Sequence, residues 1–308
     1  MPTAVHHRRG PATLFAGLAL SLILAALPAS ARTLDSAYGE VSVDGQPQRV
    51  VTLYEGALDT ALAAGVTPLA AVATRGGEGV ARYLQDRAGD IAIVGTARET
   101  NIEAVVAQRP DLILASSRLP ETQYKLLSQI APTLVPDVEP YTPDSWKQEA
   151  RFFARALGRE APVEEAIAAV EARAAELREN PATRASASLV RWMPQGALVM
   201  SPRIFSSTLL AASGFEVDDG GIVKAGRPHS DPLSLENLSR IDNDWLFLAT
   251  LNAEGDEALA SAKASPAFAR LGVIERGQVV PVDGQLWTSA SGPLAAEAIL
   301  DDIAAAIR

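Results

Sequence analysis

The stretch Asn101-Ile102-Glu103-Ala104-Val105, followed by Arg109-Pro110-Asp111-Leu112-Ile113-Leu114-Ala115, has a counterpart later in the chain. The counterpart is Ser234-Leu235-Glu236-Asn237-Leu238, followed by Ile241-Asp242-Asn243-Asp244-Trp245-Leu246-Phe247-Leu248. In both copies a residue suited to capping opens a short helix, a glutamate stands two positions later, and an apolar strand begins nine residues after that glutamate. A helix that feeds a parallel strand is a common α/β unit. Two units with equal spacing predict two lobes of similar build, and such lobes can clamp a small ligand between them.

One long helix is predicted between the two copies. Residues 162–180 are rich in alanine and glutamate, begin with Pro162 and are followed by Pro181. At 1.5 Å per residue this helix would be roughly 28 Å long, enough to join two lobes, although an ordinary surface helix is the alternative. Apolar residues recur along it at helical spacing, namely Val163, Ile167, Val170, Ala174 and Leu177.

Apolar strands alternate with helices on both sides of this long helix. The alternation is typical of a mostly parallel sheet covered by helices. The sequence therefore predicts an α/β fold of two lobes, each with a mostly parallel central sheet, joined by a single long bridging helix. The exception is a hairpin predicted over residues 39–53, turning near Asp44-Gly45. The predicted division is an N-terminal lobe over 32–158, the bridging helix over 159–181 and a C-terminal lobe over 182–308.

The first residues have the composition of an export signal. Arg8 and Arg9 form a positive segment, Leu14–Leu27 is apolar but short for a membrane span, and Ala29-Ser30-Ala31 fits a cleavage site. We expect a signal peptide over residues 1–31 and a protein that is secreted into the periplasm. A retained membrane anchor is the alternative. The residues that follow the arginine pair fit twin-arginine export poorly, but both export routes stay open.

Composition narrows the class of protein further. The chain carries a formal net charge of −10, which fits neither nucleic acid nor anionic lipid as a partner. It has no cysteine, so we expect no disulfide, no thiolate metal site and no lipid anchor. His229 is the only histidine beyond the predicted signal, which argues against a multi-histidine metal site and against most catalytic triads. We expect a monomer with no cofactor and no metal held by protein side chains.

Arginines and large aromatic side chains occur where the predicted strands end. In α/β lobes, ligands collect beyond the carboxyl ends of the strands. Guanidinium groups bind anionic oxygens and large rings offer flat apolar surfaces, so we expect a bulky anionic ligand rather than a bare metal ion. Trp287 is favoured because its polar loop offers little core to join, whereas Trp245 and Trp146 are expected to pack. The candidate ligand-binding residues are Arg98, Arg191, Trp287, Tyr54, Arg75, Arg203, Arg227 and His229.

Glu103 and Glu236 hold equivalent positions in the two copies of the motif. Each lies in the first turn of its helix, where the helix dipole favours a carboxylate, and this alone can explain them. The alternative is a matched pair of surface acids, one per lobe, that binds arginines of a two-fold symmetric partner.

The ordered set of motifs resembles the periplasmic binding proteins of iron-siderophore and vitamin B12 ABC importers, and most closely the ferric hydroxamate- and citrate-type binders. The resemblance covers essentially the whole chain after the predicted signal. It rests on Arg49-Val50-Val51-Thr52-Leu53-Tyr54-Glu55, Gly65-Val66-Thr67-Pro68-Leu69, Val94-Gly95, Ile130-Ala131-Pro132-Thr133, Ser188-Leu189-Val190-Arg191-Trp192 and Val282-Asp283, besides the first motif.

The resemblance implies that the cleft holds a preformed ferric siderophore and that Glu103 and Glu236 dock on arginines of the permease dimer. It also implies that the iron is ligated by the siderophore and not by the protein. One departure is Thr100, where the family often has proline, and it bears on the placing of Arg98. The sequence does not distinguish among hydroxamate, catecholate and citrate chelates as the ligand.

Two further functions are considered. A cobalamin or haem binder of the same fold is possible because Tyr54 or His229 could serve as an axial ligand of haem iron. A secreted α/β enzyme is disfavoured, since the chain has one histidine beyond the signal, no cysteine and no G-x-S-x-G nucleophile motif.

Overall fold

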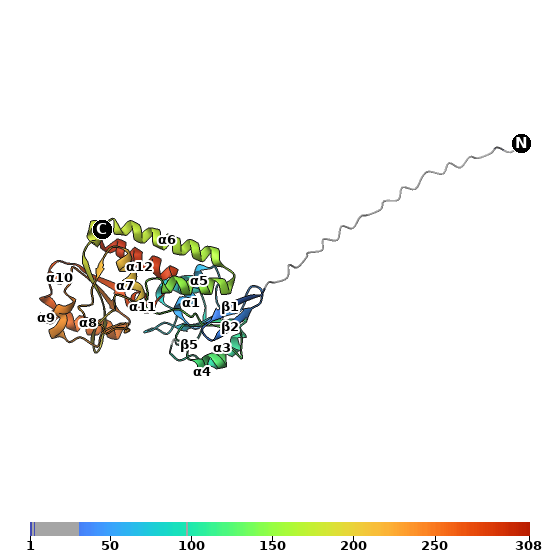
Figure 1. Ribbon diagram of the computed structural model, residues 1–308, viewed down its shortest axis with the longest axis horizontal. Coiled ribbons are helices and arrows are strands. Elements are labelled where there is room, and N and C mark those ends of the chain that lie inside the picture. Colours follow the sequence, from blue (N-terminus) through green and yellow to red (C-terminus); the bar gives the residue numbers. More distant parts are fainter. Residues whose placement is uncertain (2, 4–30, 97) are drawn as a thin grey trace.

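The computed structural model describes residues 1, 3, 31–96 and 98–308, so the predicted signal peptide lies almost wholly outside the described residues. Two α/β lobes lie side by side, and helix α6 (Glu160–Arg178) runs along both of them (Figure 1). Within the described ranges, no helix combines the length and the apolar character needed to cross a membrane.

The N-terminal lobe is built on a sheet with the strand order β5-β4-β3-β6-β7, and all of its pairings are parallel. The central strand β3 is buried over its whole length, because helices cover both faces of a parallel sheet. The strands are β3 (Val50–Thr52), β4 (Ala70–Ala73), β5 (Ala92–Thr96), β6 (Leu112–Leu114) and β7 (Thr133–Leu134). The helices are α1 (Glu55–Ala63), the 3-10 helix η1 (Arg82–Leu84), α2 (Gln85–Ala88), α3 (Ile102–Gln108), α4 (Glu121–Leu127) and α5 (Ser145–Leu157).

The hairpin predicted over residues 39–53 is wrong. The hairpin lies earlier, where β1 (Arg32–Ser36) pairs antiparallel with β2 (Gly39–Val43). Residues 50–52 form β3, which joins the parallel sheet between β4 and β6. The reason is burial: β3 is apolar on both faces, which suits the middle of a covered sheet and not a half-exposed hairpin.

Helix α6 lies within the range predicted for the bridging helix. Its buried residues are the five predicted ones, Val163, Ile167, Val170, Ala174 and Leu177. It packs against α1 and α5 of the N-terminal lobe and against α7 (Phe205–Ala212) and α12 (Pro293–Ala306) on the other side. One continuous helix therefore contacts both halves of the molecule.

The C-terminal lobe has the strand order β10-β8-β11-β12, all parallel, and β9 pairs antiparallel with β8. The strands are β8 (Ser186–Met193), β9 (Gly196–Val199), β10 (Glu216–Val217), β11 (Trp245–Thr250) and β12 (Val279–Asp283). The other helices are η2 (Pro181–Thr183), η3 (Leu235–Ile241), α8 (Ala253–Lys263), α9 (Pro266–Ala269), α10 (Gly272–Glu275) and α11 (Gly284–Ser289). The predicted two-lobed α/β architecture is therefore confirmed.

The two copies of the motif differ in their helices. Asn101 caps α3, since its Oδ1 accepts a hydrogen bond from the amide of Ala104 at 3.0 Å. Ser234 precedes a 3-10 helix and makes no capping bond; its hydroxyl is instead paired with the side-chain amide of Asn237 at 3.1 Å. The capping prediction is correct for the first copy and wrong for the second, because the Ser234 hydroxyl is engaged by a side chain.

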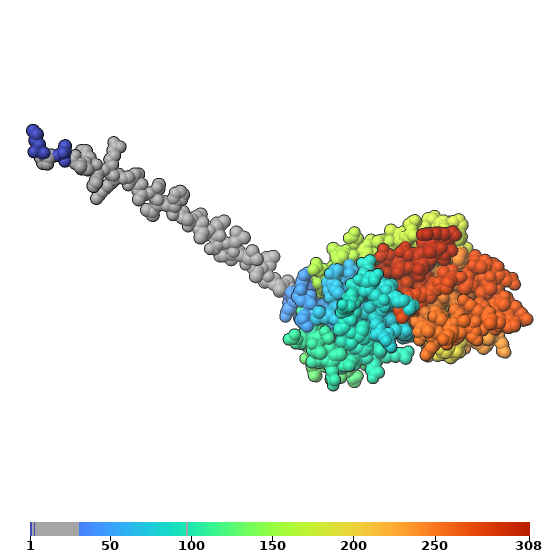
Figure 2. Space-filling model, turned by 180° about the vertical axis from the view of Figure 1, so that it is seen from behind, coloured from blue at the N-terminus to red at the C-terminus, as the bar shows by residue number. Residues whose placement is uncertain are grey.

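The end of the chain returns to the N-terminal lobe. Figure 2 shows α12, in dark red, against the blue and cyan surface, and α12 packs on α1. Asp59 of α1 has no exposed surface and accepts hydrogen bonds from the amides of Leu294 (3.0 Å) and Ala295 (2.8 Å) in the first turn of α12. A carboxylate satisfies otherwise unpaired amides there and suits the helix dipole. A second contact between the two lobes is the ion pair of Arg82 with Asp283, at 2.7 Å.

Candidate ligand-binding cleft

A cavity of about 490 Å³ is lined by residues of both lobes. On the N-terminal side, Tyr54 follows β3, Arg75 follows β4 and Arg98 follows β5. On the C-terminal side, Arg191 lies near the end of β8. Parallel strands place their carboxyl ends at one edge of a sheet, so these side chains meet although they are far apart in the chain.

Six of the eight predicted ligand-binding residues line this cavity: Tyr54, Arg75, Arg98, Arg191, His229 and Trp287. Arg203 does not, and its Nε donates to the backbone carbonyl of Tyr141 at 3.0 Å. Arg227 does not either; it is exposed and lies 3.9 Å from a carboxylate oxygen of Asp231.

Four arginines converge on the cavity: Arg75, Arg98, Arg118 and Arg191. None of the four has an ion-pair partner among the described residues. Burial, and repulsion from Arg75 and Arg98, lower the pKa of Arg191 to about 10. Burial and repulsion from Arg98 and Arg118 also lower the pKa of Arg75. The cavity therefore holds concentrated positive charge.

Arg191 is the most enclosed of these arginines, with 3% of its surface exposed. Its Nη1 donates to the hydroxyl of Thr288 at 3.4 Å, and its buried Nε has no hydrogen-bond partner in the described part of the chain. A buried guanidinium with unused donors is unfavourable unless something binds it. The group is therefore placed to bind anionic oxygens of a ligand.

The loop that carries Arg98 is fixed locally despite Thr100, the departure from the family pattern. The hydroxyl of Thr96 accepts hydrogen bonds from the amides of Arg98 (3.3 Å) and Glu99 (3.1 Å). Gly95 and Thr100 form an isolated antiparallel bridge, and Thr100 itself lines the cavity. The hydrogen bonds to Thr96 and the bridge at Thr100 thus hold Arg98 at the cavity.

Two buried carboxyl groups also line the N-terminal side, and neither is among the eight candidates. Burial raises the pKa of Glu55 to about 7, and burial also raises the pKa of Glu149. Glu149 accepts hydrogen bonds from the hydroxyls of Tyr54 (3.0 Å) and Ser117 (3.3 Å). Burial and the adjacent Glu149 raise the pKa of Tyr54 well above its usual value. Tyr54 therefore keeps its proton and is a neutral wall of the cavity.

Trp287 reaches the cavity from a setting that the sequence did not predict. It lies in α11, is 1% exposed, and stacks on Phe247 with ring centroids 5.0 Å apart. Its Nε1 donates to Asp302 at 2.8 Å. The premise that Trp287 has little core to join is wrong, because α11 folds it onto β11. Trp146 is buried, as expected, but it also lines the cavity.

Three further lining residues are not among the eight candidates: Arg118, Tyr141 and Phe205. Arg118 follows β6, and its place at the end of an apolar strand is visible in the sequence. Phe205 opens α7 and meets Trp146 edge to face, with the ring centroids 5.8 Å apart. Nothing in the local sequence marks Tyr141, because its position depends on the path of a loop between β7 and α5.

His229 lines the cavity, and its Nδ1 lies 2.7 Å from the carbonyl oxygen of Ser230. No group of three or more His, Cys, Asp and Glu side chains that could hold a metal ion occurs in the described residues. The donor set at the cavity is mostly guanidinium and hydroxyl, which does not suit a bare metal ion.

Glu103 and Glu236 are both exposed, one on each lobe. Neither has an ion-pair partner among the residues that the structure describes. Both therefore remain available to a partner.

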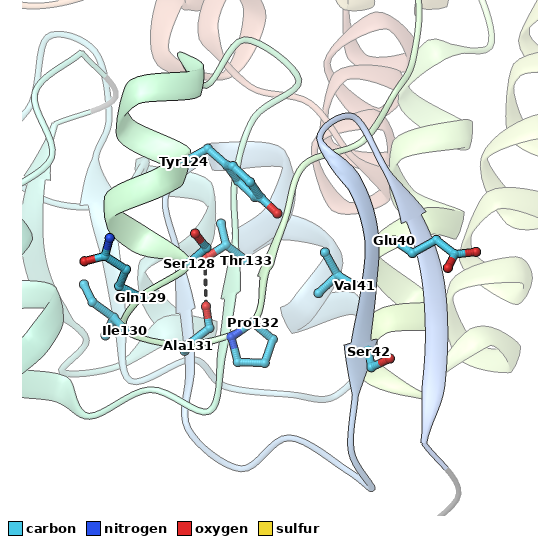
Figure 3. Close-up of a pocket in the computed structure, with 10 residues that line it drawn as sticks. All are labelled: Glu40, Val41, Ser42, Tyr124, Ser128, Gln129, Ile130, Ala131, Pro132 and Thr133. Carbon is cyan, nitrogen blue, oxygen red and sulfur yellow. Dashed lines mark hydrogen bonds between the residues drawn. The ribbon is translucent and has the colours of Figure 1, made fainter.

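A second depression, of about 470 Å³, lies between β2 and the segment from α4 to β7 (Figure 3). Val41 and Tyr124 flank it, and Thr133 donates to the carbonyl of Ala131 at its base. It is an open surface groove with one acid, Glu40, and brings no cluster of charged groups together. It is not a candidate ligand site.

Two α/β lobes, a long helix that contacts both, and a charged cavity lined by both define a solute-binding protein. The chain matches the family model described as periplasmic binding protein over residues 50–286, and it belongs to that family. The family is one of binding proteins, which removes the enzyme alternative.

Among its relatives is the probable siderophore-binding lipoprotein YfiY of Bacillus subtilis, 28% identical over 284 residues that cover 88% of this chain and 86% of that protein. The achromobactin-binding periplasmic protein of Dickeya dadantii is 29% identical and covers 84% of this chain and 86% of its own length. The crystal structure of Staphylococcus aureus SirA with staphyloferrin B has a TM-score of 0.77 at 25% identity, covering 89% of this chain and 98% of SirA. By their names, the first two relatives are extracytoplasmic binding proteins, one a lipoprotein and the other periplasmic.

Proposed function

We propose that this chain captures a strongly anionic ferric siderophore in its cleft and delivers it to an ABC importer. The observation that carries the proposal is the convergence of four arginines, without ion-pair partners among the described residues, on one cavity. Relatives named for siderophores and for ferric citrate support the substrate class.

The charge of the cavity narrows the choice among chelates. Repulsion among Arg75, Arg98 and Arg191 is relieved when anionic oxygens bind between them. Guanidinium groups bind carboxylates in paired hydrogen bonds, which favours a carboxylate-rich chelate of the citrate type over a neutral hydroxamate complex. The flat sides of Trp146 and Phe205 suit the carbon frame of such a chelate.

The iron is cargo, and its ligands come from the siderophore. The described residues offer no cluster of acids and histidine that could take the ion, and the arginines repel a free cation. The protein recognises the outer surface of the chelate, so the same site distinguishes chelates by charge and shape.

Delivery involves one exposed acid per lobe, Glu103 and Glu236, each of which pairs with an arginine of a permease subunit. A binding protein with matched contacts on its two lobes suits a two-fold symmetric permease. We propose that the protein acts in the periplasm as a diffusible monomer, which fits its lack of cysteine for a lipid anchor.

Fluorescence titration tests the assignment. We expect ferric citrate or another anionic ferric chelate to quench tryptophan fluorescence, because Trp146 lines the cavity. Arg191→Met should weaken binding by at least about tenfold, which corresponds to the loss of one charge-assisted contact. Arg270→Met, an exposed arginine of the same lobe outside the cavity, is the matched control and should bind normally.

Haem and cobalamin belong in the same titration, since His229 lines the cavity. A visible band shift with haem that is lost in His229→Ala would favour the haem alternative. If no ferric chelate bound and haem or cobalamin did, the siderophore proposal would be overturned.

A further inference from the structure

We infer that Tyr141 covers the ligand in the cleft and that Arg203, from the opposite lobe, is the positioning residue that holds Tyr141 there. The inference rests on the proposed function, because it takes the occupant of the cleft to be a ferric chelate. It also gives Arg203 a role that differs from the direct ligand contact expected from the sequence.

The backbone of Tyr141 is in an unusual conformation. Its φ of +61° lies in the left-handed region, which a tyrosine rarely adopts and which persists only when its surroundings hold it. Pro140 and Pro143 flank it in the loop between β7 and α5 and restrict the alternatives. A strained residue at the wall of a ligand cavity points to a functional requirement for its position.

Three contacts from two arginines, one in each lobe, hold Tyr141. The Arg118 guanidinium lies over its ring, 5.0 Å from the centroid, and donates to its hydroxyl. Arg203 Nε donates to its backbone carbonyl at 3.0 Å, across 62 residues of sequence. Arg118 and Tyr141 both line the cavity, whereas Arg203 stands outside the lining.

The contact made by Arg203 depends on the spacing of the two lobes. Arg203 precedes α7 in the C-terminal lobe, and Tyr141 belongs to the N-terminal lobe. The hydrogen bond between them therefore forms only when the lobes stand at their present separation. When it breaks, the loop can relax away from its left-handed conformation and the ring can leave the cavity.

This arrangement controls escape of the ligand more than entry. Contacts that close behind a bound ligand lower the dissociation rate, and most affinity differences among related complexes lie in that rate. Arg118 links the ring to the positive cluster, so the ligand, Arg118, Tyr141 and Arg203 form one chain of contacts across the cleft.

Stopped-flow fluorescence with ferric citrate is the test. Arg203→Met should speed dissociation about tenfold and leave association within about twofold of the wild type. Arg203→Lys, which keeps a donor for the carbonyl, should recover most of the slow dissociation. Tyr141→Gly should also dissociate faster while losing no thermal stability, since glycine accepts a positive φ. Arg270→Met is the control and should match the wild type.

Equal dissociation rates for Arg203→Met and Arg270→Met would overturn the inference, as would a loss of affinity that lies wholly in association. Hydrogen exchange of the ligand-free protein separates this failure from failure of the proposed function. Amides of residues 137–144 should exchange faster in Arg203→Met than in Arg270→Met, whichever ligand the protein binds. Unchanged exchange there would also overturn the inference, whereas a wild-type protein that binds no ferric chelate would overturn the proposed function alone.

Discussion

Asp59 and Glu55 are carboxyl groups that the fold holds out of water. Burial raises the pKa of each to about 7, although Asp59 accepts three hydrogen bonds, from the amides of Leu294 and Ala295 and from the Tyr83 hydroxyl. A carboxyl whose pKa is higher in the folded than in the unfolded protein binds more protons when folded. Each group therefore favours the folded state at acidic pH, and this contribution declines as the pH rises from about 4 to about 7.

This linkage predicts how Asp59→Asn changes the pH dependence of stability. The wild type should lose on the order of 1–3 kcal/mol more unfolding free energy between pH 5 and pH 8 than Asp59→Asn loses, because the amide cannot ionise. Urea unfolding at the two pH values measures the difference. Equal losses in the two proteins would mean that Asp59 titrates normally.

At the scale of elements, α12 is held on α1 by close approach as well as by the Asp59 hydrogen bonds. Gly292 precedes α12 with a φ of +119°, and a β-carbon there would lie 2.3 Å from Oδ1 of Asp59. The glycine is required both for its backbone conformation and for space. Ser291, directly before it, lines the cavity, so the junction also sets one wall of the ligand site.

Gly292→Ala should therefore destabilise the protein by roughly 3 kcal/mol and weaken ligand binding as well. Gly39→Ala is a matched control, since its φ is +109° and a β-carbon there meets nothing within 4 Å. That control should lose only about 1–2 kcal/mol, from backbone strain, and bind ligand normally. Thermal unfolding and fluorescence titration measure both effects; similar losses in the two variants would show that strain alone matters.

The order of elements could be predicted from the sequence because alternation and helical spacing are local patterns. Val163, Ile167 and Val170 indicated the buried face of α6 from spacing alone. The environment of Trp287 could not be predicted, because Phe247 and Asp302 reach it only through the fold.

The residues that line the cavity also divide into those that could be predicted from the sequence and those that could not. Arg75, Arg98 and Arg191 could be predicted because each follows or ends an apolar strand, and ligands collect beyond the carboxyl ends of strands. Glu55 and Glu149 lie on helices, where a single acid usually indicates a solvated face, and their burial depends on packing across the lobe.

At the scale of the whole molecule, the acids proposed to dock on the permease stand apart from the ligand cavity. Glu103 lies on α3 of the N-terminal lobe, and Glu236 lies on η3 of the C-terminal lobe. Neither Glu103 nor Glu236 lines the cavity. Capture and delivery should therefore be separable by mutation.

We expect Glu103→Arg and Glu236→Arg to bind ferric chelate with wild-type affinity but to abolish uptake, because each reverses the charge that faces the permease. Glu179→Arg, at the carboxyl end of α6, changes the same charge and should leave uptake intact. Titration of the purified variants and iron uptake by cells that carry them are the measurements. Normal uptake with both variants would refute the docking role.

The hydrogen bonds between Asp59 and α12 also affect the order in which the chain folds as it is synthesised. Asp59 leaves the ribosome 235 residues before Leu294, one of its two amide partners in α12. Until α12 has been made, the face of α1 that it covers stays open to water and Asp59 lacks two of its three hydrogen bonds, so the N-terminal lobe reaches its final packing only after α12 is present. The packing of α12 on α1 therefore couples the two lobes, which reach their finished form together.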